Sequence, residues 1–298
     1  STLDRSSAAS DVYKRQLEYQ TFSTYGCGLI QDEQTRGVPP LAAAQAQALV
    51  PPALRKMPGL MPRLLDLSAL DAAGKTQVLA SLNQAAHDGE DLWLALLLQS
   101  ERPADAVAAH CRSRMIVDIA GQGPCFFRFF DPRVLVQLSW LLDPGQLAWL
   151  CGPVQRFRFH LDGGWHALDR PDVDPAPRLR LTAEQSFALT QMQPLNEVLS
   201  GLDSLAPDGR IALGKTVMDH FRTARELGLA TAQERKAFAR HGLQVHPAFH
   251  RHERVRECLA AMQPDDDYPY LAAIQDLSDD DWARVRTELE RTGEPDGR

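Results

Sequence analysis

The order of apolar and polar positions divides the chain into an alternating first part and a helical second part. Leu92–Leu98 is apolar without alternation, which is typical of a central strand covered on both faces. Asp71–His87 has apolar residues at helical spacing, and Asp162-Gly163-Gly164 separates two strand-like runs, which predicts a β-hairpin. Because helix and strand patterns alternate up to residue 168, we expect an α/β fold with a mixed sheet flanked by helices in the N-terminal lobe.

The densest local signal lies in residues 124–153. Cys125–Phe130 is short, aromatic and apolar, which predicts a buried strand with Arg128 as its one charge. Asp131 then predicts a helix start, because its side chain can accept free N–H groups of the first turn. Pro132 fits the first helical position, where a missing N–H leaves no partner unsatisfied.

A second helix start follows at once. The pattern of a capping residue followed by a proline is repeated at Asp143 and Pro144. Gln146 lies three residues after the cap, where its side chain can bond back to the backbone N–H of Asp143. Gly152 and Pro153 predict the end of that helix, since glycine adopts the left-handed conformation and proline cannot continue a helix.

Three prolines in Arg170–Pro177 and the absence of a helical pattern predict a domain boundary. We expect an α/β lobe at 17–172 and an all-helical lobe at 178–298. Ser6–Gln16 resembles the translation of a sequencing-library adapter, so we interpret residues 1–16 as a non-native segment.

Capping patterns support helices in the second lobe. Thr182 with Gln185 and Thr231 with Glu234 fit capping boxes, and Ser278 precedes three aspartates at another helix start.

Composition bounds the class of function. The net charge of −7 argues against a nucleic-acid surface and against attraction to anionic membranes, and no apolar run reaches the length of a membrane span. The five cysteines are odd in number, widely spaced and embedded in apolar patterns, so we interpret them as reduced core residues of a cytoplasmic protein.

The sequence FRFFDPRVL, followed by a helical pair and LCGPV, resembles the effector-chaperone (adaptor) family of bacterial type VI secretion. That family is marked by an Arg-Phe-aromatic-Asp-Pro-Arg run that leads into a Gly-Pro, and the resemblance covers residues 25–168. It implies a cytosolic, non-enzymatic protein without a cofactor, which binds a toxic effector and helps to load it onto the VgrG spike.

The resemblance and the residue types give candidate partner-binding residues. The candidates are Arg128, Asp131, Arg133 and Trp140, with Trp165 behind them. Two interpretations remain open. Asp131 and Arg133 can serve only the helix start, and Arg128 can bond Asp131 or meet a carboxylate of a bound effector.

The alternative function is nucleotide binding or hydrolysis. Gly209–Thr216 satisfies the phosphate-loop pattern, in which backbone N–H groups surround phosphates and Lys215 reaches them. The residues before it do not read as a strand, and Ile211–Leu213 is unusually apolar for such a loop.

Two further clusters allow a functional interpretation. His241, His246, His250 and His252 could bind a metal, although their spacing is not that of a helical metal pair, and no catalytic triad is recognisable. Charge in the helical lobe is also segregated, which indicates either solvated, internally paired faces or a docking surface for a charged partner. The two groups are Arg222, Arg225, Arg235, Lys236, Arg240, Arg251, Arg254 and Arg256, and the acidic runs Asp265–Asp267 and Asp279–Asp281.

Overall fold

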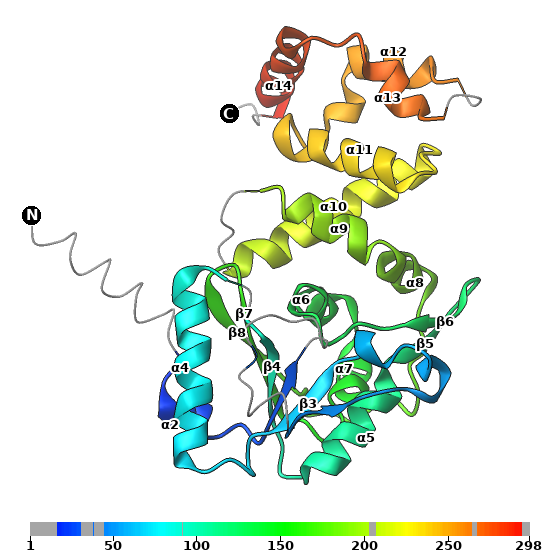
Figure 1. Cartoon of the computed structure of the whole chain (residues 1–298). Helices are drawn as coiled ribbons and strands as arrows, with labels where there is room; N and C mark the ends of the chain where they lie inside the picture. Colours follow the sequence, from blue (N-terminus) through cyan, green and yellow to red (C-terminus); the bar gives the residue numbers. More distant parts are fainter. Residues whose placement is uncertain are drawn as a thin grey trace, which may run out of the picture. The chain divides into compact units, whose positions relative to one another are not determined.

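Figure 1 shows the structure of the chain, a computed structural model. It describes residues 17–30, 38, 45–90, 92–202, 207–263 and 267–293. The predicted adapter-derived segment 1–16 lies outside this set, as do Asp265 and Asp266. The chain divides into two compact units, unit 1 with residues up to Ser186 and unit 2 with most residues from Phe187 onward.

Unit 1 is built around a six-stranded sheet with the strand order β2-β3-β1-β4-β7-β8. The apolar strand β4 lies inside the sheet, between β1 and β7. The six strands are β1 (Cys27–Ile30), β2 (Gln47–Ala48), β3 (Arg63–Asp66), β4 (Leu94–Gln99), β7 (Arg156–Leu161) and β8 (Gly164–Asp169).

The predicted α/β class is confirmed, but the described strand pairs are all antiparallel. β3 and β4 each run antiparallel to β1, so they are parallel to each other with β1 between them. The helix α4 joins β3 to β4, and β1, the first strand of the chain, lies between these two strands. The described sheet is therefore antiparallel and not mixed as expected.

Helices cover both faces of this sheet. Leu65 and Leu97 lie on one face, because both are in register with Gly28, and they pack with Val78 and Leu82 of α4. On the other face α6 packs against β7. The helices of unit 1 are α2 (Tyr19–Phe22), α4 (Ala72–Asp88), α5 (Ala104–Arg114), α6 (Pro132–Leu141) and α7 (Pro144–Cys151), with 3-10 turns η1 (Pro52–Leu54) and η2 (Pro58–Leu60).

The predicted buried strand at Cys125–Phe130 is wrong in position, and the strand that forms there is mostly exposed. The strand is β6 (Gly123–Phe126), which pairs only with β5 (Ile116–Ile119) in a two-stranded sheet. Phe127, Phe129 and Phe130 are buried, but they lie beyond the strand, with Phe129 and Phe130 in a turn. Aromatic content indicated burial correctly, and the turn required by the next helix start prevented the strand from continuing.

Burial along α5 and at the cysteines also differs in part. In α5, Val107, Ala108 and Cys111 are buried, whereas Ala106 is exposed. All five cysteines are free. Cys125 and Cys258 are only half buried. Cys125 lies on the mostly exposed strand β6, and Cys258 lies in α12, where only Val255 is fully buried.

Unit 2 is helical, as predicted. Reciprocal side-chain and backbone bonds form at Thr231 with Glu234 and at Ser278 with Asp281. The remaining elements are α8 (Ala183–Thr190), α9 (Met192–Leu199), α10 (Pro207–Glu226), α11 (Ala232–Gln244), η3 (Phe249–Arg251), α12 (Glu253–Ala260), α13 (Pro269–Ile274) and α14 (Asp279–Gly293). Within the described residues, no helix combines the length and the apolar character that crossing a membrane requires.

Candidate functional site

The candidate site begins with the aromatic turn before α6. Phe129 and Phe130 are both 1% exposed, and their rings meet edge to face with centroids 5.9 Å apart. The backbone N–H of Asp131 donates to the carbonyl of Arg128 at 3.0 Å, which closes the turn. The two buried rings therefore anchor the backbone between Arg128 and Asp131. This anchoring places the side chains of Arg128 and Asp131 next to each other.

Asp131 is the N-cap of α6, as the sequence predicts. Its carboxylate is nearly buried, at 5% exposure, and accepts the backbone N–H of Arg133 at 3.0 Å. The Arg133 side chain donates from Nε to Oδ1 at 3.0 Å and from Nη2 to Oδ2 at 2.8 Å. Such a two-point, charge-assisted contact fixes the plane of the guanidinium group.

Arg128 reaches the same carboxylate less closely, with its Nη2 3.8 Å from Oδ2 of Asp131. The side chains of Arg128 and Arg133 are 47% and 48% exposed. Two half-exposed cations thus lie next to one buried carboxylate. The arrangement can attract an anionic group without giving up the helix cap.

Asp131 and Arg133 also line a small pocket. Its volume is about 70 Å³, far below the roughly 300–1,000 Å³ of pockets that enclose a small-molecule ligand. A pocket of this size suits the tip of one side chain. Its walls are Leu92, Ala95, Asp131, Pro132, Arg133, His160 and Leu161.

Trp165 joins this region through β7. It is in register with His160, and the two rings meet edge to face with centroids 5.5 Å apart. The guanidinium of Arg158 lies 5.7 Å from the centre of the Trp165 ring. The structure therefore brings together Arg128, Asp131 and Arg133, and links Trp165 to them by way of His160.

Trp140 lies further along α6 than the other candidates. Its indole Nε1 donates to Oε1 of Gln137 on the same helix, at 2.8 Å. This contact lies within α6 and does not involve the aromatic turn, so the binding role of Trp140 stays a prediction.

Sequence reasoning missed His160 and Leu161. Both lie far from Asp131 in the chain, and only the packing of α6 against β7 brings them into the same pocket. The hairpin pattern could have predicted one of these neighbours, because a two-residue turn at Asp162 and Gly163 places Trp165 opposite His160.

The glycine of the Gly-Pro that ends the signature has a steric role. Gly152 has φ 54°, and a Cβ added there would overlap the ring of His110. That ring is held by a 2.8 Å contact between His110 Nε2 and the Leu150 carbonyl, and burial lowers the pKa of His110. Glycine is therefore required at 152 both for backbone conformation and for space.

The structure does not form a phosphate loop at Gly209–Thr216. These residues lie inside α10, and the Thr216 hydroxyl donates to the Ala212 carbonyl at 3.1 Å. A phosphate loop needs backbone N–H groups turned toward the ligand, whereas residues inside a helix direct them along the helix axis. The motif match is a coincidence of composition in a helix.

Two of the clustered histidines in unit 2, His241 and His252, have hydrogen-bond partners of their own. His241 Nδ1 lies 2.6 Å from the Tyr270 hydroxyl, and His252 Nε2 lies 2.9 Å from Oε2 of Glu288. Over the described ranges, no three His, Cys, Asp or Glu side chains gather in a way that could hold a metal ion.

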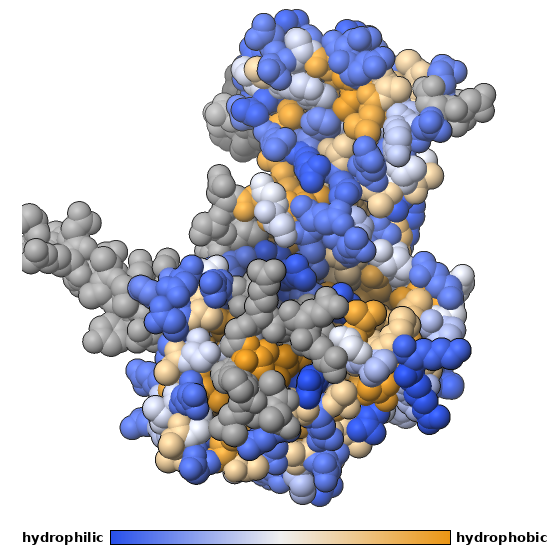
Figure 2. All heavy atoms as spheres, viewed as in Figure 1, coloured by the Kyte–Doolittle hydropathy of each residue, from blue (hydrophilic) through white to orange (hydrophobic). Residues whose placement is uncertain are grey.

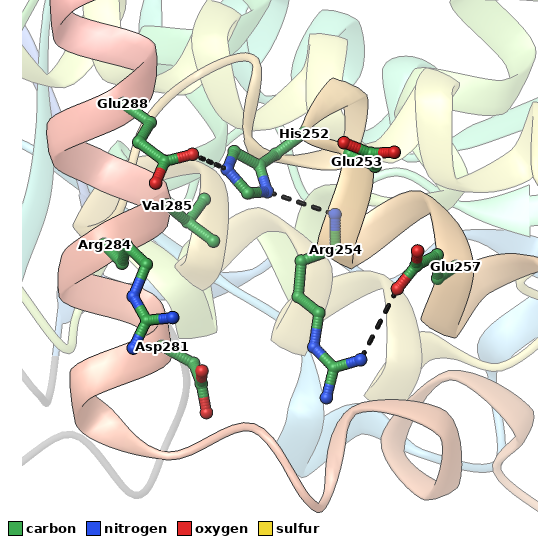
Figure 3. Close-up of a pocket in the computed structure, with 8 residues that line it drawn as sticks. All are labelled: His252, Glu253, Arg254, Glu257, Asp281, Arg284, Val285 and Glu288. Carbon is green, nitrogen blue, oxygen red and sulfur yellow. Dashed lines mark hydrogen bonds and ion pairs between the residues drawn. The ribbon is translucent and has the colours of Figure 1, made fainter.

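A second hollow, of about 280 Å³, lies between α12 and α14 (Figure 3). Glu288 contacts His252 across the hollow, and Arg254 contacts Glu257 at 3.4 Å. Ser278 at the start of α14 lowers the pKa of Asp281 by hydrogen bonding. These charges compensate one another, which favours the interpretation of solvated, internally paired faces. The lining residues are His252, Glu253, Arg254, Glu257, Asp281, Arg284, Val285 and Glu288.

The surface agrees with that interpretation. In Figure 2 hydrophilic residues dominate the visible face around α14. Further ion pairs join Lys236 to Glu197 at 2.5 Å and Arg222 to Asp219 at 2.5 Å. Part of the segregated basic charge is therefore neutralised inside unit 2.

Comparison with known proteins gives one match. Residues 40–148 match the model of a family described as a domain of unknown function, DUF4123. The match covers less than half of the chain and includes Arg128, Asp131, Arg133 and Trp140, but not Trp165. No curated protein and no solved structure matches the chain. The matched segment of this protein is thus similar to a family whose description assigns it no function.

Proposed function

We propose that this protein is a non-enzymatic adaptor that binds a type VI secretion effector and assists its loading onto the VgrG spike. The proposal places it in the bacterial cytoplasm, with the effector and the spike protein as its partners. It starts from the resemblance of the Arg-Phe-Phe-Asp-Pro-Arg run at 128–133 to the effector-chaperone family, and the family match at 40–148 contains this run in full.

The observation that carries the proposal is the geometry at the start of α6. Arg128 and Arg133 are half exposed, and both are positioned by the buried carboxylate of Asp131. Positioned arginines beside buried aromatic rings are typical of the residues that dominate protein interfaces. The adjoining pocket of about 70 Å³ accepts a side chain and is too small for a typical enzyme substrate.

The proposed mechanism is binding by surface complementarity. A carboxylate of the effector would meet the guanidinium groups of Arg128 and Arg133, and an adjacent effector side chain would enter the pocket lined by His160 and Leu161. The guanidinium of Arg133 does not have to be reoriented, because two hydrogen bonds to Asp131 already fix it, so binding loses little side-chain entropy at this residue.

The test is co-purification in a defined system. The tagged protein is expressed with the effector encoded beside its gene, and the captured material is then offered purified VgrG. The proposal predicts a stable complex with the effector and an increased yield of effector bound to VgrG. Absence of an effector complex, with the tagged protein folded and monodisperse, would overturn it.

A further inference from the structure

The two-stranded sheet formed by β5 and β6 has one packed face and one open face. Successive side chains of a strand point to opposite faces, and residues opposite each other in the register share a face. Val117 and Ile119 are 5% and 7% exposed, so their face is the packed one. The open face is formed by Ile116 and Asp118 of β5 with their partners Phe126 and Pro124 of β6.

This open face is apolar where polar side chains are expected. Phe126 is 36% exposed, Pro124 is also exposed, and Ile116 is half buried. The solvent face of an antiparallel strand pair normally carries polar residues, whereas Asp118 is the one polar residue among these four. Adjacent apolar side chains that stay in contact with water are typical of an interaction site.

The open face continues into the aromatic turn before α6. The ring of Phe126 packs against the ring of Phe130, with centroids 5.9 Å apart. The guanidinium of Arg128 lies 5.9 Å from the centre of the same Phe130 ring. Because Phe130 is itself 1% exposed, one buried ring supports both an exposed ring and a half-exposed cation.

Arg128 can pair with an anionic group from outside the chain. Its Nη2 lies 3.8 Å from Oδ2 of Asp131, which is beyond hydrogen-bond distance, and Arg133 already binds that carboxylate at two points. Within the described part of the chain, the Arg128 side chain contacts Asp131 and Phe130 and forms no hydrogen bond. A carboxylate of a partner would supply the charge-assisted hydrogen bonds that Arg128 does not make here.

Asp118 gives the open face a direction. It lies opposite Pro124, one residue pair closer to the hairpin turn than Phe126, whereas Arg128 follows Phe126 toward α6. In Figure 1 the hairpin turn points away from α6. A carboxylate beside Phe126 is therefore attracted at the Arg128 end and repelled at the Asp118 end.

The small size of the face favours a short segment over a second copy of this chain. Stable interfaces between folded proteins take about 20–30 residues from each partner, whereas the open face consists of the four residues of two strand pairs. The face adjoins the start of α6, where the effector is proposed to bind. A two-fold arrangement of two copies would bring Arg128 to Asp118 of the other copy, so the experiment includes this outcome.

We propose that Phe126 is a specificity residue of the effector site: it receives a large apolar side chain of a short effector segment, and a neighbouring carboxylate of that segment binds Arg128. This inference rests on the proposed adaptor function and states which chemistry of the effector is recognised. Phe126 lies outside the run at 128–133 on which the proposed function is based.

The first test measures the dissociation constant of the purified effector encoded beside this gene, for the wild type and three variants. Phe126→Ala removes the ring, and Phe126→Leu keeps a large apolar side chain. Tyr19→Ala is the matched control, because it removes a ring of unit 1 that is 40% exposed. We expect at least tenfold weaker binding for Phe126→Ala, a change within threefold for Phe126→Leu and a change within twofold for Tyr19→Ala.

Equal affinities of Phe126→Ala and Tyr19→Ala would overturn the inference, and the adaptor function would stand if Arg128→Glu still weakened binding. Failure of the wild type to bind the effector would overturn both. A wild-type dimer that Phe126→Ala dissociates would identify a second copy as the occupant and overturn the effector-segment proposal.

Cross-linking identifies the segment and keeps an aromatic ring at position 126, in case Phe126→Ala unfolds. The photoreactive analogue benzoylphenylalanine replaces Phe126, and the complex with the effector is irradiated and analysed by mass spectrometry. The cross-linked effector segment is expected to contain a large apolar residue next to an aspartate or glutamate. Cross-links to a second copy of this chain, or to effector segments without a carboxylate, would overturn the inference.

A double-mutant cycle tests the charge pair. Replacing the identified effector carboxylate by an amide should weaken binding to the wild type at least tenfold. The same replacement should weaken binding to Arg128→Ala less than twofold, because the pair is already lost in that variant. Equal weakening for both proteins would overturn the assignment of this carboxylate to Arg128.

Discussion

The guanidinium of Arg133 binds both carboxylate oxygens of Asp131, with Nε 3.0 Å from Oδ1 and Nη2 2.8 Å from Oδ2. The same carboxylate accepts the backbone N–H of Arg133 at 3.0 Å. One residue pair therefore begins α6 and orients a half-exposed cation. A structural role and a binding role are compatible for these residues, because Asp131, which caps α6, also orients the guanidinium of Arg133.

Removing the Asp131 carboxylate should destabilise unit 1. Asp131→Ala loses the cap and leaves Arg133 without its partner, and we expect a loss of about 1–2 kcal/mol in the free energy of unfolding, measured by urea denaturation. Asp131→Asn keeps an oxygen that can cap the helix and should lose less. Equal losses for both variants would show that charge, and not capping, holds the turn.

Substitution of Gly152 should be more damaging than substitution of another glycine with positive φ. Gly152→Ala combines an unfavourable φ of 54° with overlap of the His110 ring, and repacking around such an overlap costs about 1–3 kcal/mol. Gly163→Ala has φ 74° and open space around it, so it should lose only the conformational term of about 1–2 kcal/mol. Thermal unfolding of the two variants compares them, and equal melting temperatures would contradict the steric role of Gly152.

A glycine of the phosphate-loop pattern should respond in the opposite direction. Gly209 lies in α10, and a Cβ added there meets nothing within 4 Å. Gly209→Ala should therefore increase the stability of unit 2, by about 0.5–1 kcal/mol at most, because alanine is the better helix former. Calorimetric titration with MgATP should show no binding that depends on Lys215, and loss of such binding in Lys215→Ala would contradict the helical interpretation.

The stability of unit 2 should decrease in mild acid. Burial lowers the pKa of His220, His241 and His250 in the folded protein, whereas in the unfolded chain these side chains titrate near pH 6.5. Below about pH 6.5 the unfolded state binds more protons, so stability is present above this pH and falls as the pH decreases. Urea unfolding at pH 7.5 and pH 5.5 measures the change.

His220→Gln provides the control for this effect. His220 is 5% exposed and its ring cannot be protonated in place without burying a charge. The free energy of unfolding of the variant should depend less on pH than that of the wild type. The slope should decrease by at most about 1.4 kcal/mol per pH unit, the contribution of one proton. A dependence identical to that of the wild type would exclude His220 as a source.

Much of the fold could be predicted from the chain because its signals are local. Asp131 with Pro132 and Asp143 with Gln146 cap the two helices as expected, since these caps depend on residues within one turn. The hairpin at Asp162 was predictable for the same reason, because its neighbouring glycine tolerates positive φ.

The remainder depends on contacts between distant residues. The strand order places β1 between β3 and β4, and no local pattern specifies this insertion. The pocket beside Arg133 contains His160 only because α6 packs on β7. The aromatic run before Asp131 indicated burial but not conformation, since buried rings fit a turn as well as a strand.

The central claim is that the half-exposed Arg128 and Arg133 at the start of α6 bind an effector. Its most direct test is the dissociation constant of the purified effector for the wild type, Arg128→Glu and the control Lys56→Glu, an exposed cation elsewhere in unit 1. Arg128 lies 3.8 Å from the Asp131 carboxylate, so its reversal should leave the fold intact, as an unchanged melting temperature would show. The account predicts at least tenfold weaker binding for Arg128→Glu and less than a twofold change for Lys56→Glu. Equal affinities for all three proteins would contradict it.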